Sequence, residues 1–287
     1  MGKEKAELIH IAERFAMEGE IGSIEAHGNG HINDTFLVTC QMAEGKTRRY
    51  ILQRMNQEVF KNPKELMENV TGVTTFLQNK IRENGGDPER EALNVILLKD
   101  GGSYWQEEDN TFWRVYRFVE GADSLDVVER PEEFYESAVA FGRFQKLLAD
   151  YPAESLHETI PNFHNTIDRV EKFQKAVEAD VMKRAADVRE EIRFVLDREA
   201  DCHILCDMLA AGEIPLRVTH NDTKLNNIML DHKTGKGICV IDLDTVMPGS
   251  ALYDYGDSIR FGANTGAEDE KDLSKISCDL ELFALYT

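Results

Sequence analysis

The sequence predicts an α+β protein of two lobes, in which an antiparallel β-sheet with one packed helix precedes a mainly helical lobe. Three observations lead to this fold class. The chain has 287 residues, which corresponds to two domains at about 150 residues each. Residues 20–118 change between strand-like segments and one amphipathic helix, whereas residues 165–212 contain almost no glycine or proline. We therefore divide the chain into residues 1–118 and residues 119–287.

The first lobe opens with a predicted helix, because residues 8–15 carry apolar side chains at helical spacing. A second helix is expected to begin at Asn62 and Pro63, a pair typical of helix starts, and its apolar residues share one face. The expected strands are residues 35–39, 50–52, 94–98 and 112–116. The first two form a β-hairpin, since the segment between them is polar and contains glycine.

The second lobe is predicted from longer helical patterns. Residues 131–150 place apolar side chains near one stripe, and residues 165–212 continue the helical character. Two short apolar segments, 216–219 and 237–243, are expected to be strands within this helical lobe.

The charge balance excludes several classes of partner. Thirty-three basic and fifty-three acidic side chains give a formal net charge of −20, the wrong sign for holding a nucleic acid or an anionic membrane. Any phosphate must therefore be bound by local donors or a metal cation. The N-terminal segment lacks the apolar region of a secretion signal, and no apolar run reaches the ~18 residues of a membrane span. We expect a cytoplasmic protein.

The densest chemical signal is the octet from His220 to Asn227, which has the form H-x-D-x-x-x-x-N and follows an expected strand. Phosphoryl transfer from ATP requires an acceptor hydroxyl that loses its proton and a metal held against the phosphates. A carboxylate and an amide oxygen five residues later can supply both functions from one loop. Asp222 is the candidate base and Asn227 a candidate metal ligand.

A second carboxylate signal follows twenty residues later. Asp242 ends an apolar segment, in the manner of the kinase aspartate that binds metal, although Phe-Gly does not follow it. Asp242 is therefore a candidate Mg²⁺ ligand, because this hard cation prefers oxygen donors. Asp244 is a candidate second metal ligand or a phosphate-side group.

A glycine-rich turn in the first lobe is a candidate for approach to nucleotide phosphates, because small residues free backbone amides. The third glycine of a G-x-G-x-x-G pattern is Asn33 here, and a strand follows, which argues against a dinucleotide-binding turn. The candidate nucleotide-binding residues of this turn and the strand after it are Gly28, Gly30, His31, Asn33 and Thr35.

In this order the motifs resemble those of the aminoglycoside phosphotransferase and choline kinase superfamily, and more narrowly of N-acetylhexosamine 1-kinases. The narrower resemblance rests on residues 30–35, 50–54, 219–224, 241–249 and 253–260. It implies a two-lobed protein-kinase-like fold with a nucleotide-binding first lobe and a catalytic, acceptor-binding second lobe. It also implies ATP as the phosphoryl donor, Mg²⁺ as the cofactor and a small sugar as the acceptor.

Two departures from the resemblance affect the site. Kinases of this fold usually carry a lysine on a strand for the phosphates, whereas this chain has Gln53 and Arg54 at that point. Either residue is a candidate substitute, and Glu68 on the next helix is expected to orient Arg54 through an ion pair. The chain also ends within an expected helix at residues 283–287, where relatives are expected to continue.

Three alternatives stay open at this point. The narrower resemblance implies N-acetylglucosamine or N-acetylgalactosamine as the acceptor. Choline, an aminoglycoside or homoserine would fit the wider superfamily. A nucleotide-binding pseudokinase is the third possibility, against which the joint presence of Asp222, Asn227 and Asp242 argues.

The polar group Asp254, Asp257 and Arg260 is expected to brace the catalytic loop from below. The sequence leaves the oligomeric state open.

Overall fold

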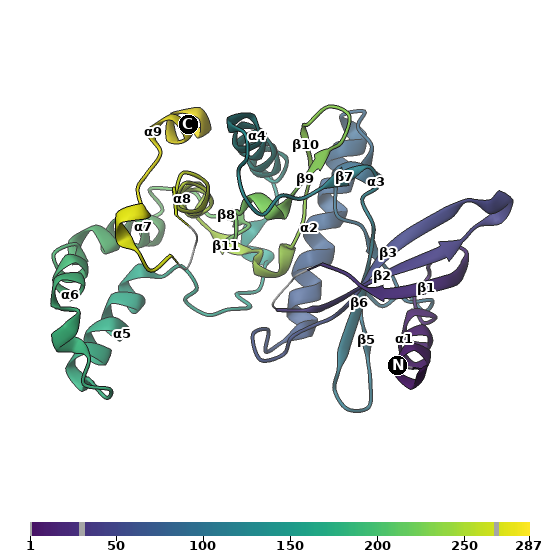
Figure 1. Ribbon diagram of the computed structural model, residues 1–287, viewed down its shortest axis with the longest axis horizontal. Helices are drawn as coiled ribbons and strands as arrows, with labels where there is room; N and C mark the ends of the chain where they lie inside the picture. The colour runs from purple at the N-terminus through teal and green to yellow at the C-terminus, as the bar shows by residue number, and fades with distance from the viewer. Residues whose placement is uncertain (1, 29–31, 267–269) are drawn as a thin grey trace.

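An antiparallel β-sheet forms the first lobe of the computed structural model, which describes residues 2–28, 32–266 and 270–287 (Figure 1). The strand order is β1-β2-β3-β6-β4, and β5 pairs with β6. The strands are β1 Glu20–Ala26, β2 Asp34–Gln41, β3 Thr47–Arg54, β4 Val95–Ile96, β5 Trp105–Gln106 and β6 Phe112–Arg117. The predicted hairpin is confirmed as β2 and β3, while the strand expected over residues 94–98 is reduced to β4.

Both faces of this sheet are covered, and strand alternation divides its side chains between them. Tyr50 and Leu52 on β3 point to the outer face, where they pack with Ile11 and Phe15 from the N-terminal segment. The predicted N-terminal helix is present as α1, Gly2–Ala12, and it lies on this outer side. Ile51 points the opposite way and packs against the core beneath the inner face.

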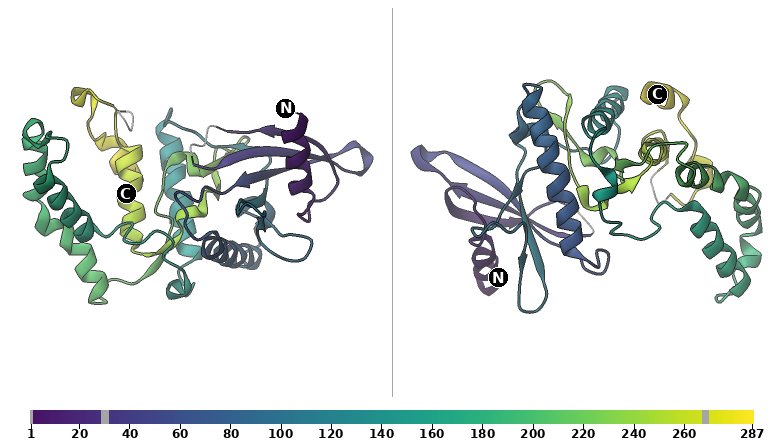
Figure 2. Two further views of the ribbon diagram at one scale, coloured as in Figure 1. Left: turned by 90° about the horizontal axis from the view of Figure 1, so that it is seen from below. Right: turned by 180° about the vertical axis from the view of Figure 1, so that it is seen from behind.

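Helix α2, Pro63–Glu83, lies between the sheet and the second lobe, as Figures 1 and 2 show. It begins where predicted, because the Asn62 side chain accepts a hydrogen bond from the Glu65 amide and proline occupies the first turn. Its apolar face packs with Phe144, Leu243 and other second-lobe residues in one shared core. The two lobes are therefore joined through a continuous apolar contact.

The second lobe is mainly helical and carries two small sheets, one ordered β10-β9-β7 and one in which β11 pairs with β8. Its helices are α4 Pro131–Leu147, α5 Thr166–Ala179, α6 Arg189–Leu196, α7 Glu199–Ala210, α8 Ala251–Gly262 and α9 Leu280–Tyr286, and the short α3 Pro88–Glu91 belongs to the first lobe. Its strands are β7 Ala122–Asp123, β8 Arg217–Thr219, β9 Ile228–Asp231, β10 Gly237–Val240 and β11 Met247–Gly249.

The predictions for the second lobe hold for its helices and for the two expected strands. The strand expected over residues 237–243 is shorter, because β10 ends at Val240 and Asp242 adopts a left-handed conformation with φ of 55°. Strands β7, β9 and β11 were not predicted, since two to four residues are too few to show a period. Within the described part of the chain, no helix combines the length and the apolar character needed to cross a membrane.

Helix α8 supplies residues beneath the candidate catalytic loop, residues 220–227, so its packing should control the candidate site. A Cβ atom on Gly262 would lie 1.9 Å from Cε2 of the buried Phe134 on α4. We predict that Gly262→Ala lowers the free energy of unfolding by about 1–3 kcal/mol, because the ring or the helix must move. Urea denaturation measures the change.

Gly256 in the same helix is the matched control. No atom lies within 4 Å of a Cβ placed there. Gly256→Ala should therefore raise the free energy of unfolding by about 0.5–1 kcal/mol through helix propensity alone. Equal effects of the two substitutions would contradict the close packing of α8 on α4.

Candidate active site

The catalytic loop, residues 220–227, is held from below by a buried carboxylate on α8. Asp254 accepts hydrogen bonds from the backbone amides of His220 (3.0 Å) and Asn221 (2.8 Å), and from the side chain of Gln145 on α4 (2.5 Å). Burial raises the pKa of Asp254, while the hydrogen bonds from these donors act to lower it. The backbone at the start of the loop is thus fixed by charge-assisted hydrogen bonds.

A second carboxylate on α8 holds the middle of the loop. The amide of Thr223 donates to Asp257 at 2.9 Å, and the Thr223 hydroxyl donates to the carbonyl of Asp254 at 2.7 Å. Arg260 pairs with Asp257 at 2.8 Å. The polar group beneath the loop therefore contacts it as the sequence predicted, with Arg260 acting through Asp257.

His220 connects the loop to the segment that carries Asp242. The imidazole is buried, and Phe141 and Phe144 meet it edge-on. Its Nε2 lies 2.9 Å from the carbonyl oxygen of Ile241, and its Nδ1 lies 3.3 Å from the amide nitrogen of Asp222. With the proton on Nε2, the ring donates to Ile241 and accepts from Asp222. One side chain therefore sets the spacing between the Asp222 and Asp242 backbones.

The carboxylate of Asp222 is partly exposed, as an acceptor-facing base requires. The Asn227 amide group donates to the Asp222 carbonyl (2.8 Å) and to its Oδ2 atom (3.2 Å). Lys224 lies 3.5 Å from Oδ1. Because the nitrogen of the Asn227 side chain is committed to Asp222, its Oδ1 atom faces elsewhere and can serve as an oxygen ligand.

Asp242 fits the role of a metal ligand. No hydrogen-bond donor among the described residues contacts its carboxylate, and the backbone amide of the preceding Ile241 donates to the carbonyl of Asn227 at 2.9 Å. Burial raises the pKa of Asp242 to about 6, and the negative charge of Asp244 acts in the same direction. A carboxylate in this setting is stabilised by a cation, so Asp242 and the Asn227 side-chain oxygen fit a hard ion such as Mg²⁺.

Asp244 has a different environment. Both of its oxygens are engaged, since Arg114 contacts Oδ1 at 2.5 Å and Oδ2 at 2.8 Å, and Asn33 donates to Oδ2 at 2.8 Å. In this arrangement Asp244 is an ion-pair partner, and its expected part as a metal ligand has no support. In the described part of the chain, no three His, Cys, Asp or Glu side chains form a metal-binding group.

The structure separates Gln53 from Arg54. Gln53 points inward, where its oxygen accepts from Arg114 and its nitrogen donates to the Thr35 hydroxyl at 3.1 Å. Arg54 points to the other face, is half exposed and pairs with Asp34 across the hairpin. Adjacent residues of a strand point to opposite faces, so both cannot face the inner side.

The expected ion pair between Arg54 and Glu68 is not formed. Glu68 instead contacts His157 at 2.7 Å and lies 3.9 Å from Lys64 on its own helix. Arg54 lies on the strand face opposite to Gln53, so Asp34 is the carboxylate beside it. Neither Gln53 nor Arg54 therefore supplies a positive charge at the inner face of the sheet.

The glycine-rich turn is described only in part, because Gly30 and His31 lie outside the described residues. Gly28 has φ of 74°, a conformation that glycine adopts without strain, and nothing lies within 4 Å of a Cβ there. Asn33 bridges outward from the turn: it donates to Asp244 and accepts from the Asn56 amide at 2.9 Å. The turn is thus linked directly to the Asp242–Asp244 segment.

The sequence interpretation missed Arg114. Its side chain is almost completely buried on β6 and forms the ion pair with Asp244. The available signal was an arginine inside an otherwise apolar strand, since a buried charge requires a partner. No sequence pattern identifies that partner, which lies 130 residues away along the chain.

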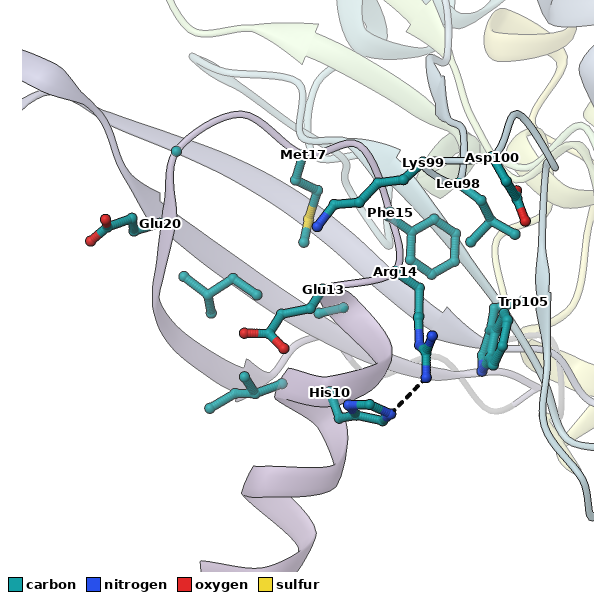
Figure 3. A pocket seen from close by; sticks show the side chains of 14 residues that line it. His10, Glu13, Arg14, Phe15, Met17, Glu20, Leu98, Lys99, Asp100 and Trp105 are labelled. Atoms are coloured by element: carbon teal, nitrogen blue, oxygen red, sulfur yellow. Dashed lines mark hydrogen bonds between the residues drawn. The ribbon is translucent and has the colours of Figure 1, made fainter.

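A large hollow of about 790 Å³ lies on the outer side of the sheet, away from this site (Figure 3). The end of α1 and the segment around Leu98 and Trp105 form its wall. The Arg14 guanidinium lies 4.6 Å over the Trp105 ring and contacts His10 at 2.9 Å. None of the candidate catalytic residues lines this hollow, so we assign it no part in phosphoryl transfer.

A protein-family model matches most of the chain. The family model described as "Phosphotransferase enzyme family" (APH) matches residues 23–280. The chain belongs to the phosphotransferase enzyme family. The match spans both lobes and includes the catalytic loop and the Asp242–Asp244 segment.

Solved structures resemble this phosphotransferase in fold. Amicoumacin kinase hAmiN in complex with AMP-PNP, Ca²⁺ and Ami has a TM-score of 0.60 at 13% identity, over 100% of this chain and 78% of that chain. Choline kinase from Cryptosporidium parvum Iowa II has a TM-score of 0.58 at 17% identity, over 98% of this chain and 76% of that chain. Aminoglycoside 2′-phosphotransferase-IIIa in its GDP complex has a TM-score of 0.58 at 14% identity, over 100% of this chain and 88% of that chain. The predicted two-lobed, protein-kinase-like fold is confirmed.

The environment of Asp242 leads to a prediction for the metal-free protein. Asp242→Asn should raise the free energy of unfolding at pH 7.5 by at most about 1 kcal/mol, because the raised pKa marks a disfavoured charge that solvent partly screens. Asparagine also tolerates the left-handed backbone at this position. The same variant should lose the gain in ADP affinity that Mg²⁺ provides.

Denaturation in EDTA at several pH values checks the first part, and calorimetry with ADP checks the second. The folded-state pKa is above the unfolded value, so wild type takes up a proton as the pH falls from about 6 to 4. The stability difference should disappear over this range. A variant that is equally destabilised at every pH would contradict the assigned environment.

Proposed function

We propose that this phosphotransferase is an ATP- and Mg²⁺-dependent kinase that phosphorylates N-acetylglucosamine or N-acetylgalactosamine at the anomeric oxygen. The observation that carries the proposal is the frame made by His220, which joins the backbone amide of Asp222 to the carbonyl of Ile241. It holds the partly exposed carboxylate of Asp222 and the unpartnered carboxylate of Asp242 on one rigid support. In this proposal residues 1–118 bind the nucleotide and residues 119–287 hold the acceptor. The glycine-rich turn, including Gly28 and Asn33, contributes to the nucleotide side.

The proposed chemistry needs a base and a cation site close together. Asp222 accepts the proton of the acceptor hydroxyl, while Asn227 orients its carboxylate. Asp242 and the Asn227 oxygen would hold Mg²⁺, which neutralises negative charge on the phosphates when it is bound. The anomeric hydroxyl is more acidic than a primary alcohol, so a carboxylate can serve as its base.

The charge balance around Asp222 favours a neutral acceptor. Lys224 lies beside Asp222, and Arg260 pairs with Asp257, so cations accompany both partly exposed carboxylates. Asp254 is buried under the loop, and its carboxylate accepts hydrogen bonds from the loop's backbone amides. A quaternary amine or an aminoglycoside would be attracted by uncompensated negative charge, and neither Asp222 nor Asp257 supplies it. A neutral sugar fits it better.

The alternative acceptors stay open, because the solved structures of similar fold include a choline kinase and an amicoumacin kinase. Choline, an aminoglycoside and homoserine are accordingly the competing acceptors, and a pseudokinase without turnover is the competing class. The narrower motif resemblance, especially over residues 241–249 and 253–260, supports the sugar.

An acceptor panel tests the proposal. We predict ADP release with N-acetylglucosamine or N-acetylgalactosamine at least tenfold faster than with choline, homoserine, kanamycin or no acceptor. Phosphorus NMR of the product should show the sugar 1-phosphate. A sugar 6-phosphate, or transfer to an amine-bearing acceptor alone, would contradict the acceptor assignment. No turnover with any acceptor would favour the pseudokinase.

Asp222→Asn tests the proposed base. The amide can still accept from Asn227, so the loop geometry should be kept while proton acceptance is lost. We predict a fall in kcat of roughly 10²–10⁴. The affinity for Mg²⁺·ADP, measured by calorimetry, should stay within about twofold of wild type, because Asp222 does not contribute to nucleotide binding. Undiminished turnover would remove Asp222 from the mechanism.

A further inference from the structure

The guanidinium of Arg114 lies at the centre of the site, but it is not free to bind a ligand. The side chain is 1% exposed, and its partner Asp244 is 4% exposed. Its N–H groups contact both oxygens of Asp244, the side-chain oxygen of Gln53 (3.1 and 2.9 Å) and the sulfur of Met67 (4.0 Å). A bound phosphate would have to displace one of these partners.

Gln53 acts on Arg114 from the neighbouring strand. The sheet register places Thr35, Gln53 and Arg114 opposite one another on β2, β3 and β6. Thr35 accepts from the Gln53 nitrogen, which directs the Gln53 oxygen toward Arg114. The three side chains form a row on the inner face, and its effect is to fix the plane of the guanidinium.

Asp244 passes this constraint to the segment that carries Asp242. The two aspartates are separated by Leu243 alone, which is buried in the shared core. On the other side of Asp244, the Thr245 hydroxyl donates to the His220 carbonyl at 2.7 Å, and Asn221 donates to the Thr245 carbonyl at 2.8 Å. The segment is held from the sheet at Asp244 and from the catalytic loop at Thr245.

A buried ion pair adds little to the stability of a fold, because both charges lose their hydration. Apolar residues of similar volume often stabilise a fold equally well. Its bidentate geometry, however, fixes direction as well as distance. The position of this pair, next to an unpartnered carboxylate, favours a role in orientation.

We propose that Arg114 is a positioning residue for the nucleotide site, which holds Asp244 and through it fixes Asp242, without touching the phosphates. It takes the place of the expected cation on β3, from the next strand of the sheet. This inference rests on the proposed function, in which Asp242 holds the metal. It assigns Gln53 to the support of Arg114 and leaves Arg54 outside the site.

The test separates orientation from stability. Arg114→Met leaves Asp244 as a buried unpaired charge and should destabilise the fold, whereas Arg114→Met with Asp244→Asn removes both charges and should regain most of the melting temperature. For each protein, calorimetry measures the affinity for ADP with EDTA and with Mg²⁺. We expect the double variant to bind ADP in EDTA within about twofold of wild type. Its Mg²⁺-dependent gain in affinity should fall at least tenfold.

Arg117→Met is the matched control, because Arg117 lies on the same strand and pairs with Glu18 and Glu89 away from the site. It should keep the full Mg²⁺-dependent gain. Arg114→Lys keeps the charge without the fork, and it should show an intermediate gain.

Three results would overturn the inference. A double variant that keeps the wild-type Mg²⁺-dependent gain, whatever its melting temperature, would show that Arg114 does not position Asp242. A tenfold loss of ADP affinity in EDTA would make it a phosphate contact. A wild-type protein that binds ADP without any gain from Mg²⁺ would contradict the proposed function itself, and the inference would fall with it.

Discussion

The candidate active site depends on the buried ion pair between Arg114 and Asp244. A guanidinium and a carboxylate that lose water must meet each other in good geometry, so the inner face of the sheet has to lie against the segment that follows β10. Helix α2 fills the space around this contact with apolar side chains from both lobes. The relative placement of sheet and segment is therefore set by one polar requirement and one apolar core acting together.

The second lobe meets this contact with a frame of its own. Asp254 holds the start of the catalytic loop, and His220 joins that loop to the carbonyl of Ile241. Two residues at the site, Asn221 and Asp242, have positive φ, which costs free energy in residues other than glycine. The surrounding hydrogen bonds offset this cost. The arrangement allows Asp222 and Asp242 to remain open to ligands while their backbones are fixed.

The sequence predicted those parts of the molecule that have a strong period or a compact motif. The β2–β3 hairpin, α2 and the octet ending at Asn227 belong to this group. The contacts of Gln53 and Arg114 at the inner face could not be predicted from the sequence. Helices cover both faces of the sheet, so the alternation of apolar residues does not show which face Gln53 occupies. The partners of Arg114 and Glu68 lie 130 and 89 residues away along the chain, and contacts between such remote residues are set by tertiary packing alone.

In the proposed metal site, Asp242 and Asn227 are the ligands, while Asp244 remains paired with Arg114. A crystal structure of the protein with Mg²⁺ and ADP tests it most directly. We expect a metal ion bound by the Asp242 carboxylate and the Asn227 side-chain oxygen, with the ion pair between Arg114 and Asp244 intact. A metal ion bound by Asp244, with Arg114 turned onto the phosphates, would contradict it.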